Sequence, residues 1–237
     1  MANHIHTIPV LDALREPEGC AFCVMHSKLE QDAINFVMGP SYMENDVRTQ
    51  TNKLGFCKSH LDAMYTHQNR LGLALMLQTH MQKLNKDMTA IVKNKLPAPF
   101  FGKDTNGPLA KIRTLLAKTN ESCYVCHKVE DTFNRYIDTF LYLWGKGGED
   151  AKLIKSQKRY CLPHFTQLLE AADKLSRSKR ENFTEDVILP QLAYMQELEG
   201  DLEWFTLKFD YRYADQPWKN AKDALPRALS VLGCKKE

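Results

Sequence analysis

The chain has 237 residues, of which 43% are hydrophobic and 26% charged, and its formal net charge is +3. These proportions are ordinary for globular proteins, and the length allows either one large domain or two small ones. A charge so close to neutral does not indicate a nucleic-acid or anionic membrane partner. The longest apolar stretch, from Leu71 to Leu77, is too short to span a bilayer, and the N-terminus has no basic region followed by an apolar run. We therefore expect a cytoplasmic protein without a membrane partner.

Apolar residues recur at helical spacing through most of the chain, and no run alternates for long enough to predict a sheet. An all-α fold is therefore expected. In the first half, a capping box at Ser41-x-x-Glu44 predicts a helix start and Gly55 its stop, and a long helix is interrupted only at Gly72. In the second half, Pro190 is expected to kink the last helix or to mark its true start. The predicted helices cover residues 24–38, 41–54, 59–96, 109–118, 128–144, 149–156, 163–175 and 184–209.

Four pairs of metal-binding residue types, arranged as two copies of one pattern, are the most informative feature of the chain. Each copy is a Cys-x-x-Cys pair followed by a Cys-x-x-His pair, with 33 intervening residues in the first copy and 34 in the second. The two copies are offset by 103 residues at the first pair and by 104 at the second. The first copy consists of Cys20, Cys23, Cys57 and His60, and the second of Cys123, Cys126, Cys161 and His164.

Three thiolates and one imidazole form a ligand set that suits a tetrahedral metal ion. We expect each copy to hold its own ion, so that a site bridges two turns separated by roughly 35 residues of helical chain. Each pair is expected to open a helix, where the positive end of the helix dipole favours thiolate. Reduced cysteines, as expected in the cytoplasm, also favour metal binding over disulfides. The sequence therefore predicts two Cys3His sites in a duplicated helical protein.

The duplication also predicts a domain organisation. Residues 1–96 are expected to form the first metal-binding repeat, and residues 109–180 the second. The Pro- and Gly-rich segment 97–108 is expected to be a linker. Residues 181–237 are expected to supply a long helix and a tail that pack on the repeats. The two repeats and this C-terminal part form either separate domains or one compact domain.

Zinc, with two ions per chain, is the expected metal, because Cys3His is a common closed and structural zinc set. An iron–sulfur cluster is the alternative, because clusters prefer four cysteines but accept histidine in their place. The run from Cys123 to His127 matches the form for covalent c-type haem attachment, but Val24 occupies the matching place in the first copy. Haem is therefore not expected. Cys234 is expected to be a free thiol, and the aromatic cluster of Trp204, Phe205, Phe209, Tyr211, Tyr213 and Trp218 is expected to be core or a docking surface rather than a pocket.

Several short sequence motifs also indicate a family resemblance. They are C-A-F-C at Cys20, S-Y-M-E at Ser41, G-F-C-K-S-H at Gly55, S-C-Y-V-C at Ser122, Y-C-L-P-H-F at Tyr160 and F-D-Y-R-Y-A-D-Q-P-W-K-N-A-K-D-A from Phe209. Over nearly its whole length the chain resembles a bacterial family of unknown function with duplicated Cys-x-x-Cys and Cys-x-x-His pairs. The resemblance implies a cytoplasmic bacterial protein and supplies no activity, substrate or catalytic residue.

The favoured function is a non-enzymatic helical protein with two structural zinc sites, which presents a surface or groove to a protein or small-molecule partner. The alternative is an iron–sulfur redox or sensor protein, or a thiolate metal-handling protein, with its chemistry on the same six cysteines. A metal-dependent hydrolase or transferase ranks last, because three thiolates and a histidine leave no open position for water. No residue is predicted to be catalytic, no nucleic-acid partner is indicated, and the oligomeric state stays open.

Overall fold

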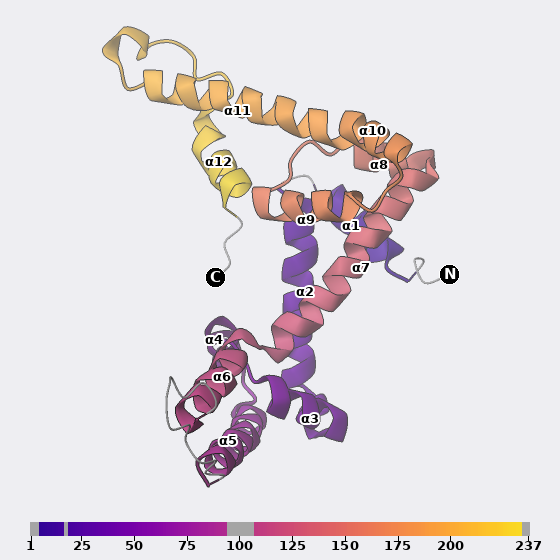
Figure 1. The fold of residues 1–237 in the computed structure, drawn as a ribbon. Coiled ribbons are helices and arrows are strands. Elements are labelled where there is room, and N and C mark those ends of the chain that lie inside the picture. The colour runs from indigo at the N-terminus through magenta and orange to yellow at the C-terminus, as the bar shows by residue number, and fades with distance from the viewer. Residues whose placement is uncertain (1–4, 17–18, 94–106, 234–237) are drawn as a thin grey trace, which may run out of the picture. The chain divides into compact units, whose positions relative to one another are not determined.

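The computed structural model describes residues 5–16, 19–93 and 107–233, and within these ranges every regular element is a helix (Figure 1). The all-α prediction is confirmed. Cys234 and almost all of the predicted linker 97–108 lie outside the described residues. The elements are α1 (Thr7–Arg15), α2 (Ala21–Met38), η2 (Pro40–Met43), α3 (Asn45–Leu54), α4 (Lys58–Thr66), α5 (Arg70–Lys93), α6 (Pro108–Glu121), α7 (Tyr124–Lys146), α8 (Gly148–Lys155), α9 (Leu162–Ala172), α10 (Arg177–Phe183), η3 (Thr184–Ile188), α11 (Leu189–Leu207), η4 (Tyr211–Tyr213), η5 (Ala221–Asp223) and α12 (Ala224–Leu232).

The chain divides into two compact units. Unit 1 comprises Met1–Lys28 and Thr132–Glu237, and unit 2 comprises Leu29–Asp131. The boundaries fall inside α2 and α7, so each of these two helices contributes residues to both units. Each of the two expected repeats, 1–96 and 109–180, therefore also contributes residues to both units.

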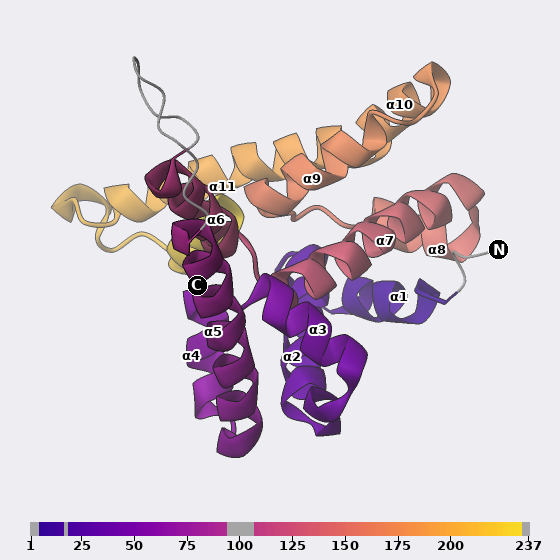
Figure 2. The same ribbon diagram turned by 60° about the horizontal axis from the view of Figure 1, so that its bottom comes forward.

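The core of unit 2 is built from the apolar faces of five helices. Helix α5 packs against α3 and against α6 (Figure 2). Burying these apolar side chains is the main favourable contribution to the stability of the unit. The buried cluster contains Ile34, Val37 and Met38 of α2, Val47 of α3, Met64 of α4, Leu73 and Met76 of α5, and Val125 and Val129 of α7.

Two local predictions in unit 2 were wrong. The long helix predicted from Ser59 is two helices, α4 and α5, and the break lies at residues 67–69 instead of Gly72. The Asn69 side chain caps α5 by accepting a hydrogen bond from the Gly72 N–H at 2.9 Å, and it donates to the Met38 carbonyl at 2.8 Å. A Cβ atom at Gly72 would come within 2.6 Å of the Asn69 amide nitrogen, so glycine permits this close cap.

The predicted capping box at Ser41 does not form either. Gly39 and Pro40 lead into the 3-10 turn η2, and the Ser41 hydroxyl donates to the Phe36 carbonyl at the end of α2. Helix α3 begins after Glu44, without a side-chain cap. The stop at Gly55 is confirmed, and its φ of +61° is a conformation that glycine adopts at little cost.

Unit 1 is centred on Phe22 of α2, which is fully buried. Its ring centroid lies 6.0 Å from that of Phe133, 5.1 Å from that of Phe140 and 5.7 Å from that of Tyr160. Helix α1, which the sequence analysis did not predict, buries Val10 and Leu14 and packs against α8. The aromatic centre thus joins the start of α2 to the segment that precedes α9.

The C-terminal part of unit 1 is a helical run from α10 through η3 to α11, with α12 packed against α11 (Figure 1). Pro190 lies in the first turn of α11, directly after the π-helical turn η3. Because proline lacks the N–H of a regular helix and its ring crowds the preceding turn, the widened turn accommodates it. The expectation of an irregularity at Pro190 is therefore confirmed.

The residues that the structure describes include no helix with both the length and the hydropathy needed to cross a bilayer.

Candidate metal centres

The structure gathers the eight predicted ligands into two groups, each of three cysteines and one histidine. Site 1 lies in unit 1 and site 2 in unit 2, and in each site the four ligand atoms all lie within 4.8 Å of one another. Each of the eight predicted ligands belongs to one of the two sites. Site 1 consists of Cys20, Cys23, Cys161 and His164, and site 2 of Cys57, His60, Cys123 and Cys126.

The pairing within the sites corrects the sequence analysis. Each site combines the Cys-x-x-Cys pair of one repeat with the Cys-x-x-His pair of the other. The sulfur of Cys23 lies 3.5 Å from that of Cys161, across 138 positions in sequence, and the sulfur of Cys57 lies 3.8 Å from that of Cys126, across 69 positions. The prediction that each site closes roughly 35 residues of chain is therefore wrong.

Helix length explains the exchange of partners. Helix α2 starts at the first Cys-x-x-Cys pair and has 18 residues, and α7 starts at the second and has 23. At 1.5 Å per residue, these helices carry the chain about 27 Å and about 35 Å away from the pairs at their starts. Along the chain, a Cys-x-x-His pair follows each of these helices. The helix carries that pair away from the Cys-x-x-Cys pair at its own start, and the pair lies close to the Cys-x-x-Cys pair of the other repeat.

All four pairs open helices, as predicted. Cys57 and Cys161 are the N-cap residues of α4 and α9, with extended backbone, and His60 and His164 lie in the first turns that follow. The first turn of a helix has backbone N–H groups without helical partners and carries the positive end of the helix dipole. Two helix N-termini thus meet at each site and favour negative charge on its sulfurs.

The distances between ligand atoms fit a single ion in each site. With Zn–S bonds of about 2.3 Å and Zn–N bonds of about 2.0–2.1 Å, a tetrahedron has S···S edges of roughly 3.8 Å and S···N edges of roughly 3.6 Å. In site 1 the Nδ1 atom of His164 lies 3.2 Å from the sulfur of Cys161, 3.3 Å from that of Cys23 and 4.0 Å from that of Cys20. In site 2 the Nδ1 atom of His60 lies 3.1 Å, 3.3 Å and 3.4 Å from the sulfurs of Cys57, Cys123 and Cys126.

The crowded sulfurs of site 1 shift one another's pKa in opposite directions. Hydrogen bonds from Cys161 and Cys23 lower the pKa of the Cys20 thiol far below its usual range. The hydrogen bond with Cys20, together with burial and the negative charge there, raises the pKa of Cys161 to about 12. A cation bound among the sulfurs would offset this repulsion and favour three thiolates together.

In site 2 the histidine and the cysteines shift one another's pKa. Burial raises the pKa of Cys123, but the hydrogen bond from His60, backbone hydrogen bonds of Cys126 and Cys57 and the charge of His60 together lower it to about 6. Burial lowers the pKa of His60, but hydrogen bonds with Cys123 and Glu30 raise it to about 9. Burial and the charge on Cys123 raise the pKa of Cys126 above its usual range. The side chains of this site thus favour a thiolate–imidazolium pair, which a bound metal ion would replace.

The two sites differ in their exposure to solvent. In site 1, Cys20, Cys161 and His164 retain 4%, 1% and 6% of their accessible surface. The ring centroid of His164 lies 5.1 Å from that of Phe133, within the aromatic centre of the unit. In site 2, Cys126 is exposed, and Cys57 is half-buried, as Cys23 of site 1 is. Solvent reagents therefore reach the sulfurs of site 2 more easily than those of site 1.

Glu30 of α2 is a functional residue that the sequence analysis missed. Its Oε1 atom accepts a hydrogen bond from Nε2 of His60 at 2.8 Å, while Nδ1 of His60 faces the three sulfurs. A carboxylate on the distal nitrogen orients a metal-binding histidine and raises its basicity. A single glutamate on a helix gives no sequence signal for this role, because the contact depends on how α2 and α4 pack.

Part of the C-terminal aromatic cluster packs around a loop on α11, as expected, whereas Phe209 and Tyr211 of the same cluster are exposed. The ring centroid of Trp218 lies 5.8 Å from that of Phe205, and the indole N–H of Trp204 donates to the Pro217 carbonyl at 3.1 Å. The buried ammonium of Lys208 donates to the carbonyls of Tyr213 and Ala214 at 2.8 Å and 2.6 Å. These contacts hold the segment between α11 and η5.

Comparison with known proteins gives a family and no further relative. A family model described as a family of unknown function (DUF6062) matches residues 1–237, and the chain belongs to that family. No curated protein and no solved structure matches the chain. The resemblance seen in the sequence is thereby confirmed.

Proposed function

We propose that this DUF6062 protein is a non-enzymatic zinc protein whose two structural Cys3His sites hold its helices in place, so that it can present a surface to a protein or small-molecule partner. The observation that carries the proposal is the closed donor set, in which three sulfurs and one ring nitrogen lie within 4.8 Å of one another in each site. Four protein donors complete a tetrahedron and leave no position for water or substrate, as is typical of structural zinc.

The location of the donors supports a structural role. In site 1 an ion would join the start of α2 to the start of α9, which are separated by 138 positions in sequence. A cross-link over a long stretch of chain removes much conformational freedom from the unfolded state. In zinc-finger peptides, the apparent binding free energy of structural zinc is about 10–16 kcal/mol at neutral pH. Loss of the ion is therefore expected to unfold the surrounding helices.

The compactness of each donor set supports zinc over an iron–sulfur cluster. In a cluster the protein ligands bind different irons around a sulfide-bridged core, which keeps their donor atoms apart. Here all four donor atoms lie within 4.8 Å of one another, a separation that suits one central ion. Three sulfurs and one imidazole nitrogen match the preference of zinc.

A metal-handling role is the second candidate, and it is supported by site 2 alone. Cys126 is exposed and Cys57 is half-buried, so a competing ligand has access to two of the four donors. Access of this kind allows a metal to pass to another thiolate by ligand exchange. A site 2 ion that exchanges within seconds would favour this role, and one that stays bound for hours would favour the structural role.

The experiment that tests the proposal is elemental analysis, with an ultraviolet–visible spectrum, of protein purified without oxygen. Two zinc ions per chain and no visible absorption are expected. Iron with acid-labile sulfide would overturn the zinc assignment, and absence of any metal would overturn the sites themselves. Removal of the zinc with a chelator is expected to reduce the helical circular-dichroism signal, and an unchanged melting curve would overturn the structural role.

A further inference from the structure

The two metal sites arise from one duplicated pattern, but they differ in the residue beside the histidine. The offset of 103 residues between the repeats makes Phe133 of α7 the counterpart of Glu30 of α2. In site 2 the Glu30 carboxylate accepts a hydrogen bond from His60 at 2.8 Å. In site 1 the ring centroid of Phe133 lies 5.1 Å from that of His164. One histidine is therefore packed against an aromatic ring, and the other is held by a carboxylate.

The turn within each Cys-x-x-His pair differs in the same direction. Between Cys57 and His60, site 2 has Lys58 and Ser59, and both are exposed. The Ser59 hydroxyl lies 3.3 Å from the Cys57 sulfur, within hydrogen-bond distance. Site 1 has leucine and proline at the two matching positions. Site 2 is thus bordered by polar, exposed residues where site 1 has apolar ones.

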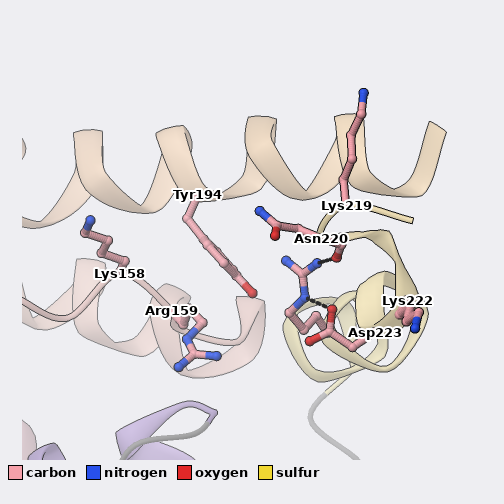
Figure 3. Close-up of a pocket in the computed structure, with 8 residues that line it drawn as sticks. Lys158, Arg159, Tyr194, Lys219, Asn220, Lys222 and Asp223 are labelled. Carbon is pink, nitrogen blue, oxygen red and sulfur yellow. Dashed lines mark hydrogen bonds and ion pairs between the residues drawn. The ribbon is translucent and has the colours of Figure 1, made fainter. Parts of the chain in front are cut away.

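Access from solvent also distinguishes the two sites. Cys126 of site 2 is exposed, whereas the cysteines of site 1 are buried or, at Cys23, half-buried. A cleft of about 480 Å³ lies in unit 1 beside the loop that leads into site 1, and Lys158 and Arg159 of that loop line it (Figure 3). None of the four ligands of site 1 lines this cleft. A small oxidant in solution therefore reaches a sulfur of site 2 first.

Hydrogen bonds of the protein itself join the two turns of site 2. The Tyr124 N–H, at the start of α7, donates to the Gly55 carbonyl at 2.9 Å, and the Ser122 hydroxyl donates to the last carbonyl of α3 at 2.7 Å. These bonds hold the segment that leads to Cys57 against the start of α7. The sulfurs of Cys57 and Cys126 lie 3.8 Å apart. Two groups held this close react at a high effective concentration.

We propose that site 2 is a redox-sensitive site, at which a hydroperoxide converts Cys57 and Cys126 into a disulfide and the zinc ion is released. The inference rests on the proposed function, because it takes the ion of site 2 to be zinc. Oxidation of a cysteine follows its thiolate character and its exposure, and a metal-bound Cys126 combines the two. Site 1 is expected to keep its ion under the same conditions.

The reaction has two steps, and hydrogen peroxide illustrates them. The Cys126 thiolate attacks one peroxide oxygen, so that a sulfur–oxygen bond forms, the oxygen–oxygen bond breaks and water leaves with a proton from solvent. The Cys57 thiolate then attacks the sulfur of the resulting sulfenic acid. The sulfur–sulfur bond forms, the sulfur–oxygen bond breaks, and a second water leaves with a second proton. The two sulfurs lose two electrons to the peroxide, and the ion, left with two protein donors, is released.

The disulfide replaces the ion as the cross-link between the starts of α4 and α7. Cys57 and Cys126 are 69 positions apart, and a covalent bond between them restricts the unfolded chain. Oxidation therefore differs from chelation, because both remove the zinc but only oxidation leaves the two helices joined. We expect site 2 to release its zinc while the helices of unit 2 stay folded.

The test is oxidation of the zinc-loaded protein with a small excess of hydrogen peroxide, stopped with catalase. We expect a metal indicator to detect release of one of the two ions. Mass spectrometry without reduction should identify a linked pair of peptides that contain Cys57 and Cys126. A thiol reductant with added zinc should restore the second ion. Retention of both ions, release of both together, or a first disulfide that joins Cys123 to Cys126 or lies in site 1 would overturn the inference.

Two comparisons separate this inference from the proposed function. Metal content is measured before peroxide is added. Protein purified without zinc would contradict the proposed function, and the linked peptides would still show whether Cys57 and Cys126 form a disulfide. Circular dichroism then compares oxidised with chelator-treated protein. The oxidised protein should keep more of its helical signal, and an equal loss would contradict the cross-link.

A pair of matched variants tests the role of Cys57. Cys57→His keeps four donors at site 2 but removes the sulfur that closes the disulfide, so Cys126 should remain a sulfenic acid that dimedone traps. Cys161→His is the control, because Cys161 caps α9 in the other repeat as Cys57 caps α4. In the control the disulfide of site 2 should form as before. Equal trapping in the two variants would contradict the role of Cys57, and the linked peptides of the unsubstituted protein decide the pairing even where a variant binds less metal.

Discussion

The Nε2 atom of His60 lies 2.8 Å from the Oε1 atom of Glu30, on the side of the ring opposite the three sulfurs of site 2. The carboxylate accepts a hydrogen bond from the Nε2 N–H, so that Nδ1 is the nitrogen that faces the sulfurs and would bind a metal ion once it has released its proton. This contact prepares the imidazole for a metal ion before one binds.

The first prediction concerns this contact. Glu30→Ala should weaken metal binding at site 2 by about 10–100-fold, the usual effect of losing a carboxylate behind a metal-binding histidine. Site 1 should keep its affinity. Competition with a chromophoric zinc chelator measures both sites in one titration. Asp87→Ala, which removes the carboxylate that pairs with Lys83 on α5 of the same unit, is the control and should change neither affinity. Equal weakening of both sites by Glu30→Ala would show that the contact has no specific role.

The second prediction tests which pairs share an ion. Because Cys20 and Cys161 belong to site 1, the double variant Cys20→Ser/Cys161→Ser should lose one ion and keep the other. The double variant Cys20→Ser/Cys57→Ser damages both sites and should lose both ions. Metal content per chain, measured on soluble protein after gel filtration, distinguishes them. The opposite result, two ions lost in the first variant and one in the second, would mean that each repeat binds its own ion.

The third prediction follows from the difference in exposure. A thiol-alkylating reagent should modify Cys126 first and release the ion of site 2, because Cys126 is exposed, whereas Cys57 of site 2 and Cys23 of site 1 are both half-buried. Cys20 and Cys161, which are buried, should be modified later, as the second ion leaves. Mass spectrometry of the peptides, taken together with the colour change of a metal indicator, follows both events. Simultaneous release of the two ions would show that the sites open together.

The fourth prediction concerns the buried amide that holds the loop before site 1. Gln191→Leu leaves the N–H and carbonyl of Tyr160 without their partners, and each unsatisfied buried group costs about 1–3 kcal/mol. We expect the free energy of unfolding to fall by about 2–4 kcal/mol, measured by urea denaturation of the metal-loaded protein. Gln196→Leu, at an exposed position of the same helix, is the control and should have little effect. Equal stability of the two variants would contradict the role given to Gln191.

The helix boundaries show how far local sequence signals reach. Gly55 ends α3 as predicted, because a positive φ is a property of one residue and its immediate neighbours. The break between α4 and α5 was misplaced, because it depends on Asn69 reaching the carbonyl of Met38, 31 positions away. The Ser41 hydroxyl likewise donates a hydrogen bond to a carbonyl at the end of α2 instead of capping the start of α3. Where a residue has two possible hydrogen-bond partners, packing decides between them.

The sequence alone determined that the protein is helical, which eight side chains gather, and that they form two sets of three cysteines and one histidine. These features are local, because helical periodicity and the spacing of a Cys-x-x-Cys or Cys-x-x-His turn act over a few residues. Only the tertiary structure decided which pairs meet, that Glu30 supports His60, and that Phe133 packs against His164 at the matching place. The two Cys-x-x-Cys pairs are chemically equivalent, and so are the two Cys-x-x-His pairs, so either pairing yields the same ligand sets. The lengths of α2 and α7 and the packing of their apolar faces select between the two pairings.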